Sequence, residues 1–365
     1  MAMNSNEVVL DLSAVQFEGK ERQLATHGGL SVSVFRFASG IAAVRVRNTV
    51  GEIVVLPYHG HQIWDATFHG RRLTMASVFD EPVATGEYVK NYGAFLVHCG
   101  ANAIGNPAPN DTHPLHGDIP NATFQQAGLI LGRDDAGAYV EVTGTATMRA
   151  AFSHHYDFQP VVRLRETSGK VELDVTITNH RAKPMELMYM AHVNFRPVDG
   201  AVLLDTVPDE AKHFRVRTHL PSYAAGTQAY RHLLTGFQAD PASHRKIVAG
   251  RAVDPELVAG MDFKAGPDGW AHSMQLLPDG TADIISHRTA ELDHGVRWMT
   301  RNGDEDALGL FLPATSDADG REAERKKGNV KQLAPGASFK TKVVFGGLTA
   351  AEAKDAAAVI AKIRG

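Results

Sequence analysis

Alternation of apolar and polar residues, which is typical of half-buried strands, runs through most of the chain. In the clearest case, Lys170–Thr178, the side chains of Val171, Leu173, Val175 and Ile177 would share one face of a strand. Shorter runs of the same kind predict further strands within residues 31–57, 122–179 and 338–345. The pattern therefore indicates a chain that is strand-rich from end to end.

Helical signals are few. The segment Thr349-Ala-Ala-Glu352 has the spacing of a capping box and predicts a C-terminal helix that ends near residue 363. Residues 253–260 predict a loop or a short helix. Residues 93–111 are dense in Gly, Asn and Pro and predict a long loop, and the charged run 317–331 predicts a solvated loop.

These patterns predict a mainly β protein, built as one large antiparallel β-sandwich with a short C-terminal helix. We expect an N-terminal strand or extension over residues 1–30, a single sandwich domain over 31–348 and a helix over 349–365. No internal repeat and no low-complexity linker divides the chain further.

Composition narrows the class of protein. The chain has 365 residues, 44% of them hydrophobic, which is enough for a large core. A net charge of −4 without any basic run argues against a nucleic-acid partner. No apolar run reaches about 18 residues, so we expect no membrane partner. Cys99 is the only cysteine and no signal peptide is apparent, which together predict a cytoplasmic protein.

Two stretches carry candidate chemistry. In Met185–Asp205, His192 follows an apolar run, and burial or a nearby carboxylate can tune such a histidine for proton transfer near neutral pH. In Thr112–Phe124, His113 and His116 sit in a Gly- and Pro-rich segment that follows the predicted long loop. The alternative interpretations are a core histidine in the first stretch and solvated loop histidines in the second.

Other residues suggest a metal or a sugar. His59 and His61 are two positions apart, so on a strand they would point the same way and form a plausible metal pair. The alternative is an ordinary polar strand face. Trp64 and Trp270 offer aromatic faces that can stack on the C–H face of a pyranose, and the alternative is that they belong to the core.

The order of several motifs resembles the galactose mutarotase (aldose 1-epimerase) superfamily, and more closely a bacterial branch of it known as a domain of unknown function. The resemblance covers residues 50 to 346. Its motifs are His116-Gly117, Thr178-Asn-His180 followed by Ala191–Phe195, residues 269–273 with 278–280, and residues 323–329 before 333–336. It implies a twisted β-sandwich with an open sugar-binding cleft on one sheet.

The resemblance also implies an activity, the interconversion of the α and β anomers of an aldose without a cofactor. It makes His192 the general acid and His116 the second histidine, which hydrogen-bonds the sugar near its ring oxygen. Asp262 would bind a sugar hydroxyl, and Asn194 and His113 are further expected substrate ligands. The expected partner is a small carbohydrate, and a homodimer is the candidate assembly.

Two departures from the superfamily pattern stand out. Pro313 occupies the place where the superfamily has its catalytic Glu, and Glu324 is the nearest substitute as base or substrate ligand. The segment from Asn102 to Asn106, expected to bind substrate through Asn102, lacks the Arg that follows Gly in the superfamily. The substrate is therefore expected to differ from galactose or glucose.

Three functions follow from the sequence. The first is a mutarotase-like isomerase. The second is a metal-dependent sugar isomerase or lyase on the same scaffold, motivated by His59, His61, His113 and His116. The third is a non-catalytic carbohydrate-binding protein. A bound divalent ion with histidine ligands favours the second, and sugar binding without turnover favours the third.

Overall fold

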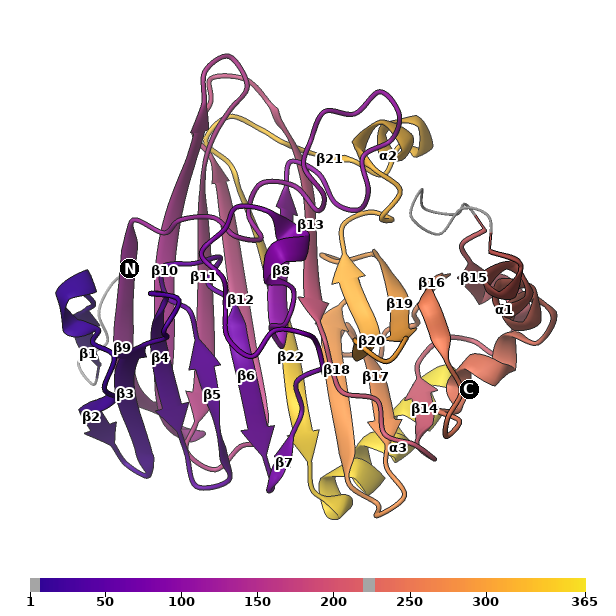
Figure 1. Ribbon diagram of the computed structural model, residues 1–365, viewed down its shortest axis with the longest axis horizontal. Helices are drawn as coiled ribbons and strands as arrows, with labels where there is room; N and C mark the ends of the chain where they lie inside the picture. Colours follow the sequence, from indigo (N-terminus) through magenta and orange to yellow (C-terminus); the bar gives the residue numbers. More distant parts are fainter. Residues whose placement is uncertain (1–6, 219–226) are drawn as a thin grey trace.

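Two large antiparallel sheets stack face to face in the computed structural model, which describes residues 7–218 and 227–365 (Figure 1). The first sheet has the strand order β1-β9-β10-β11-β12-β22-β18-β17-β14. The second has the order β15-β16-β19-β20-β13-β8-β6-β5-β4-β3-β2, with β21 paired to β13 and β7 to β6. The chain crosses between the sheets repeatedly, so both sheets mix early and late strands.

The strands of the first sheet are β1 (Val8–Asp11), β9 (Gln126–Asp134), β10 (Gly137–Ala150), β11 (His154–Arg165), β12 (Lys170–Asn179), β14 (Val202–Asp205), β17 (Trp270–Leu276), β18 (Ala282–Arg288) and β22 (Ser338–Leu348). Those of the second are β2 (Arg22–His27), β3 (Leu30–Arg36), β4 (Ala42–Arg47), β5 (Gly51–Val55), β6 (Ile63–Phe68), β7 (Arg71–Arg72), β8 (Leu96–Ala101), β13 (Met185–Val193), β15 (Phe214–Val216), β16 (Val253–Met261), β19 (His294–Arg301), β20 (Asp306–Ala314) and β21 (Lys331–Leu333).

Three α-helices lie at the periphery of the sheets (Figure 1): α1 (Gln228–Ala239), α2 (Arg321–Lys327) and α3 (Ala350–Arg364). Short 3-10 helices span Ala14–Gln16, Tyr88–Asn91, Ala211–His213 and Pro241–Arg245. No helix of the described residues is long and apolar enough to cross a membrane.

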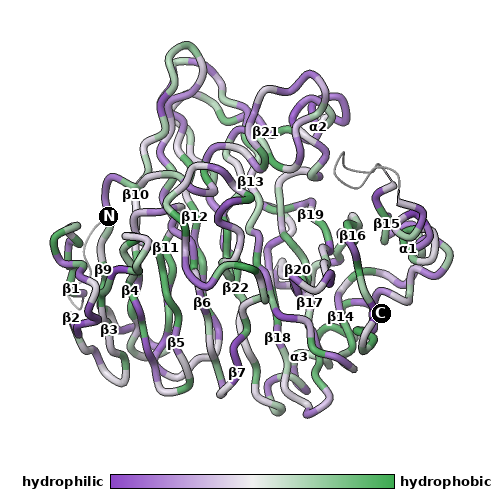
Figure 2. Tube along the Cα trace, in the orientation of Figure 1, coloured by the Kyte–Doolittle hydropathy of each residue, from purple (hydrophilic) through white to green (hydrophobic). Residues whose placement is uncertain are grey.

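The main core lies between the two sheets. Along β12 every second residue is buried, as the alternation in the sequence predicted. Phe95 joins the layers, because its ring contacts that of Phe195 edge-on at 5.0 Å and that of Phe345 on β22 at 5.6 Å. In Figure 2 hydrophobic segments follow the strands of both sheets, whereas α2 is mainly hydrophilic.

The mainly β class and the C-terminal helix are confirmed. Helix α3 begins with the predicted capping box, in which the backbone N–H of Glu352 donates to the Thr349 hydroxyl and the Glu352 carboxylate accepts from the backbone N–H of Thr349. The predicted strand at 338–345 is part of β22.

Three local predictions were wrong. The loop expected over residues 93–111 contains β8, all of whose residues are buried, so its sequence lacks the alternation of a half-buried strand. Residues 253–260 form most of β16 and not a loop or short helix. The charged run 317–331 contains α2, and α1 was not anticipated.

Several histidines are enclosed by the fold. His61 and His98 have no exposed surface and His287 is 1% exposed. Burial lowers the pKa of His61 to about 4 and lowers those of His98 and His287 to about 3. These side chains are therefore neutral in the folded protein at pH values at which the unfolded chain is protonated.

We expect the free energy of unfolding to fall steadily as the pH drops from about 6.5 towards 4. Because the pKa values of these histidines are lowered by folding, they take up protons in this window only in the unfolded state. Each such histidine therefore lowers the free energy of unfolding by roughly 1.4 kcal/mol per pH unit. Urea unfolding between pH 7.5 and 5 measures this slope.

Replacing His287 with Phe should make that slope shallower, because the ring packs between Phe263 and Phe311 and needs no charge there. The matched control is His232→Phe, at an exposed position of α1. Equal slopes in the wild type and His287→Phe would show that His287 takes up a proton as readily in the folded state as in the unfolded one.

Candidate functional site

A cleft of about 200 Å³ brings both predicted histidine stretches together. It lies at the face of the 13-stranded sheet that is covered by the connections before and after β8. Polar and aromatic side chains line it, namely Tyr88, Tyr92, His116, His192, Arg217, Glu256 and Trp298. Apolar residues of the sheet, including Met190, Val258, Val296 and Leu312, complete the wall. A hollow of this kind, with few polar groups over an apolar base, is typical of a small-molecule site.

His192 lies near the end of β13 and is 3% exposed. Its Nδ1 is 2.7 Å from Oδ1 of Asn194, whose Nδ2 donates to the carbonyl of Ala94 at 3.0 Å. Because the amide nitrogen is committed as a donor, Oδ1 must accept, and Nδ1 of His192 carries the ring proton. Burial lowers the pKa of His192 to about 4, so the ring is neutral at pH 7 and Nε2 keeps a lone pair.

His116 has the opposite arrangement. The backbone N–H of Gly105 donates to Nδ1 of His116 at 3.3 Å, so in the neutral ring the proton resides on Nε2. Burial, and secondarily the nearby His192, hold the pKa of His116 well below its usual value. The two imidazole centres are 5.6 Å apart and their planes are nearly perpendicular. The cleft thus offers one proton acceptor and one proton donor at pH 7.

Aromatic rings enclose the histidine pair. The edges of Tyr92 and Trp298 meet His192, with ring centres at 5.7 and 5.2 Å, and Tyr88 lies against His116 at 4.6 Å. The Tyr92 hydroxyl is 3.5 Å from Nε2 of His192 and donates to Asn194 Oδ1 at 3.3 Å. Burial raises the pKa of both tyrosines well above the usual value, so both hydroxyls stay protonated.

Glu256 supplies the carboxylate of the cleft. It lies on β16, where its Oε1 accepts from Arg217 at 2.6 Å and its Oε2 accepts from the indole N–H of Trp298 at 2.7 Å. Sequence reasoning missed Glu256 because residues 253–260 were interpreted as a loop or short helix. The available signal was the apolar run Leu257–Ala259 that follows it, which is too short to distinguish a strand from a helix.

The loop that carries His116 is fixed to the end of β8. The Gly100 carbonyl accepts hydrogen bonds from the backbone N–H groups of Asp118 and Ile119, at 2.8 and 3.0 Å. In return, the Gly100 N–H donates to the His116 carbonyl at 2.9 Å. Gly117 has a φ of +85°, and a Cβ there would lie 2.3 Å from the Gly100 carbonyl oxygen. Only glycine fits this close approach.

Comparison with known proteins identifies the family. Residues 38–346 match the model of a domain of unknown function, DUF4432. The chain belongs to the DUF4432 family. No curated protein matches its sequence significantly.

Solved structures show that this DUF4432 protein has the galactose mutarotase-like fold. A protein of Klebsiella pneumoniae that has been proposed to be an aldose 1-epimerase superposes with a TM-score of 0.81 at 18% identity, over 98% of this chain and 96% of that one. A galactose mutarotase-like protein of Clostridium acetobutylicum superposes with a TM-score of 0.56 at 14% identity, over 90% and 98%.

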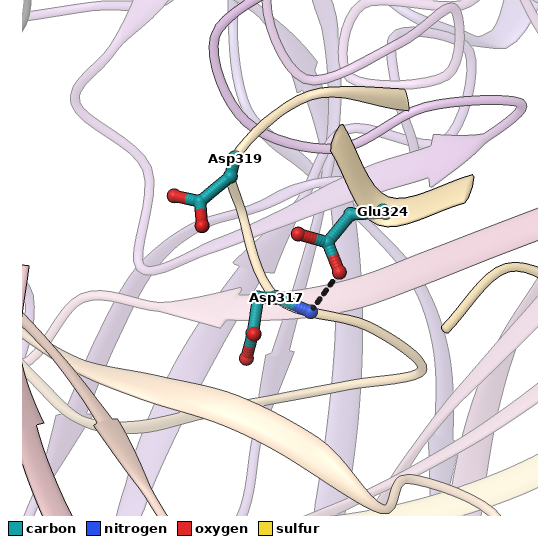
Figure 3. Close-up of side chains that lie close together, drawn as sticks. All are labelled: Asp317, Asp319 and Glu324. Carbon is teal, nitrogen blue, oxygen red and sulfur yellow. Dashed lines mark hydrogen bonds between the residues drawn. The ribbon is translucent and has the colours of Figure 1, made fainter. Parts of the chain in front are cut away.

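Glu324 of the DUF4432 chain, expected as the substitute base, does not line the cleft. Its fully buried carboxylate accepts from the backbone N–H of Asp317 at 3.2 Å (Figure 3), from Asn329 Nδ2 at 2.7 Å and from Lys327 Nζ at 2.8 Å. These hydrogen bonds hold Glu324 within the segment around α2.

The same segment contains a group of carboxylates. Asp317, Asp319 and Glu324 bring possible metal-binding atoms within 4.8 Å of one another, the one such group among the residues described (Figure 3). The Lys327 ammonium contacts all three carboxylates at 3.1, 2.7 and 2.8 Å. Their compensating cation is therefore a side chain of the protein itself.

The proposed metal pair is not assembled. His59 and His61 lie in the turn between β5 and β6, not on a strand, and Gly60 between them has a φ of +61°. His59 Nε2 is 3.1 Å from the Asn91 amide, whereas the His61 ring packs against Phe124. Because the two histidines lie in a turn, they do not share the strand face that the predicted metal pair required.

His113 faces α2 and not the cleft. Its Nδ1 is 2.7 Å from the Pro114 carbonyl, and its Nε2 is 3.3 Å from Asp111. Asp111 in turn accepts from the backbone N–H groups of Ala108 and Glu322, which ties the His116 loop to the first turn of α2.

None of the other expected sugar ligands lines the cleft. Trp64 is 4% exposed and belongs to the core, and Asn102 does not line the cleft. Trp270 lies on β17 of the nine-stranded sheet, where the Arg288 guanidinium covers it. Asp262 is paired with Arg215 in a neighbouring hollow. Asn194 has no exposed surface, and it orients His192 through the hydrogen bond between its Oδ1 and Nδ1 of the ring.

Replacing Gly117 with Ala should destabilise the protein by about 2 kcal/mol or more, because the new Cβ meets backbone atoms that cannot move aside. Gly40→Ala is the matched control, since Gly40 has a similar φ of +87° but open space around its Cβ. Urea unfolding compares the two variants, and equal losses would mean that the loop has room at Gly117.

Proposed function

We propose that the protein is an aldose 1-epimerase-like isomerase, which interconverts the anomers of a sugar bound in the cleft. The observation that carries this proposal is the complementary state of the two histidines. His192 offers a lone pair on Nε2, and His116 offers a proton on Nε2, with ring centres 5.6 Å apart. Opening a pyranose ring needs one group of each kind near the anomeric carbon.

In the proposed reaction, Nε2 of His192 accepts the proton of the C1 hydroxyl as a C1=O double bond forms. The bond between C1 and the ring oxygen breaks, its electron pair moves to the ring oxygen, and the N–H of His116 stabilises the developing charge. The proton held by His192 then passes to the ring oxygen, which gives the open-chain aldehyde. Rotation about the C1–C2 bond and the reverse steps close the ring to the other anomer.

This assignment changes the role that the resemblance implied for His192. A histidine with a pKa of about 4 is unprotonated at neutral pH, so it starts the cycle as a proton acceptor and donates only the proton that it has just received. The Asn194 amide supports the same state, because its oxygen accepts the proton on Nδ1 of His192 and the neutral ring then has no proton on Nε2.

The remaining groups of the cleft suit the binding of a sugar. Trp298 and Tyr88 present aromatic surface for C–H groups. The hydrogen bond between Arg217 and Glu256 holds both side chains in place. Glu256 can accept hydrogen bonds from sugar hydroxyls, and Arg217 can donate to them. The proposed chemistry requires no cofactor, because every proton involved moves between the substrate and His192.

The metal-dependent alternative receives less support. Of the four histidines that motivated it, only His116 lines the cleft, whereas His59, His61 and His113 contact other parts of the fold. A non-catalytic carbohydrate-binding protein would use the same cleft, and turnover distinguishes it from the isomerase.

Replacing His192 with Ala should lower the rate of anomeric exchange by roughly 10²–10⁴-fold, because the proton acceptor is lost. NMR exchange spectroscopy on a panel of aldoses, uronic acids and deoxy-sugars, with and without a chelator, measures the rate. His180→Ala, at a half-exposed histidine paired with Asp157 outside the cleft, is the matched control.

Absence of exchange by the wild type with every sugar, together with sugar binding, would favour the non-catalytic alternative. Exchange that a chelator abolishes would favour the metal-dependent one. A loss below tenfold in His192→Ala would show that another residue accepts the proton.

The kcat/KM of the wild type should stay level between pH 8 and about 5.5 and fall only on approach to the pKa of His192, about 4. An ordinary histidine base would lose activity near its usual pKa of about 6.5. Exchange rates across this range, with circular dichroism to verify folding at each pH, separate the two cases. A midpoint near 6.5 would contradict the proposed neutral state of His192.

A further inference from the structure

The cleft does not end at the histidine pair. A second hollow of about 320 Å³ adjoins it and shares four lining residues with it, Arg217, Val258, Val296 and Ala318. Its other side is formed by Arg215 on β15 and by the segment from Asp317 to Lys327, whose carboxylates appear in Figure 3. The two hollows therefore form one continuous trough over β16 and β19.

The size of the trough indicates a ligand larger than one sugar ring. Pockets that bind small molecules usually enclose about 300–1,000 Å³. The volume of the cleft around His116 and His192, about 200 Å³, lies below that range. Together with the adjoining hollow of about 320 Å³, the volume of the whole site lies within it.

The base of the second hollow includes a glycine beside the Arg215 side chain. Gly260 on β16 lines it between Arg215 of β15 and Val296 of β19, its partners in the sheet. A Cβ at Gly260 would meet nothing nearer than the Arg215 guanidinium, at 3.3 Å. The absence of a side chain at this position preserves the depth of the hollow.

Each cation around the second hollow already has an acidic partner, and carboxylates outnumber cations there. Arg217 pairs with Glu256 at 2.6 Å, and Arg215 pairs with Asp262. Lys327 contacts the three carboxylates of its own segment. Among the described residues of this wall, every cation has an acidic partner, so none is left over for a phosphate or carboxylate group. Fixed donors and acceptors of both kinds suit neutral hydroxyls.

We infer that the second hollow is a further sugar subsite and that the natural ligand is a neutral disaccharide or longer oligosaccharide. Its reducing-end ring lies at His116 and His192, and the next ring occupies the hollow between Arg215 and Asp319. This inference rests on the proposed function for the orientation of the ligand, because the histidine pair marks the position of the anomeric carbon.

Isothermal titration of the whole protein tests the subsite directly. The ligands are glucose, galactose, maltose, cellobiose, lactose and glucose 6-phosphate. At least one disaccharide should bind ten times more tightly than either monosaccharide, and glucose 6-phosphate should bind no better than glucose. Disaccharides that bind no more tightly than monosaccharides would overturn the inference, and preferred binding of glucose 6-phosphate would overturn its claim of a neutral ligand.

Filling the hollow should abolish the preference for the disaccharide. Gly260→Phe places a ring over the base of the hollow. Thr218→Trp narrows the hollow from an exposed position, and this second variant keeps the test valid if Gly260→Phe does not fold. Gly236→Phe, at an exposed position of α1, is the matched control. If both filled variants fold and retain the preference, the disaccharide binds elsewhere and the inference is wrong.

The same experiments keep the two proposals apart. Tight disaccharide binding without anomeric exchange would contradict the proposed isomerase and support the subsite. Exchange on monosaccharides with no advantage for disaccharides would support the isomerase and overturn the subsite.

Discussion

The geometry of the site depends on the side-chain amide of Asn194. Its nitrogen donates to the Ala94 carbonyl, and its oxygen accepts from both His192 and Tyr92. Its backbone N–H donates to the Phe95 carbonyl, so the residue joins the end of β13 to the segment that leads into β8. One buried amide therefore fixes the tautomer of His192, the place of the Tyr92 hydroxyl and the spacing of two chain segments. An Asp at this position would offer only acceptors and leave the Ala94 carbonyl without its donor.

The sequence predicts strands well where one face of the sheet is exposed. Residues 170–178 show this, because each polar residue of this stretch lies outside the core and each apolar residue lies inside it. Prediction failed where a strand is enclosed on both faces. In β8 the Gly-, Ala- and Cys-containing sequence is buried throughout, so local composition resembles that of a loop and only the neighbours β6 and β13 make it a strand. Strand β16 is only partly buried, and it was missed because its apolar run Leu257–Ala259 is too short to distinguish a strand from a helix; Glu256 was missed with it.

The pairing of His116 with His192 came from the order of motifs and not from any local pattern. Nothing within either stretch indicates that the two rings approach to 5.6 Å, because that distance depends on the hydrogen bonds between Gly100 and the His116 loop. The tyrosines of the cleft come from the 3-10 helix Tyr88–Asn91 and from Tyr92, which follows it, and no periodicity predicts this helix. Charge was equally misleading, since the run 317–331 resembles a solvated loop although Glu324 within it is completely buried. Sequence periodicity reports the solvent side of an element, whereas the site is built where solvent is excluded.

The replacement of the superfamily's glutamate by Pro313 fits a rearranged site. Pro313 lies on β20, and the carboxylate of the cleft comes from β16, which is separated from β20 only by β19. From β16, Glu256 reaches Arg217 and the Trp298 indole, so its charge is compensated before any substrate binds. A carboxylate held in this way is fixed in position, so in the proposed complex it can accept hydrogen bonds from sugar hydroxyls. In the proposed reaction, proton transfer falls to His192, whose burial keeps it neutral and whose free lone pair lies beside the Tyr92 hydroxyl. The carboxylate on β16 and the neutral histidine on β13 thus line one cleft, in which the proposed reaction gives substrate binding to the first and proton transfer to the second.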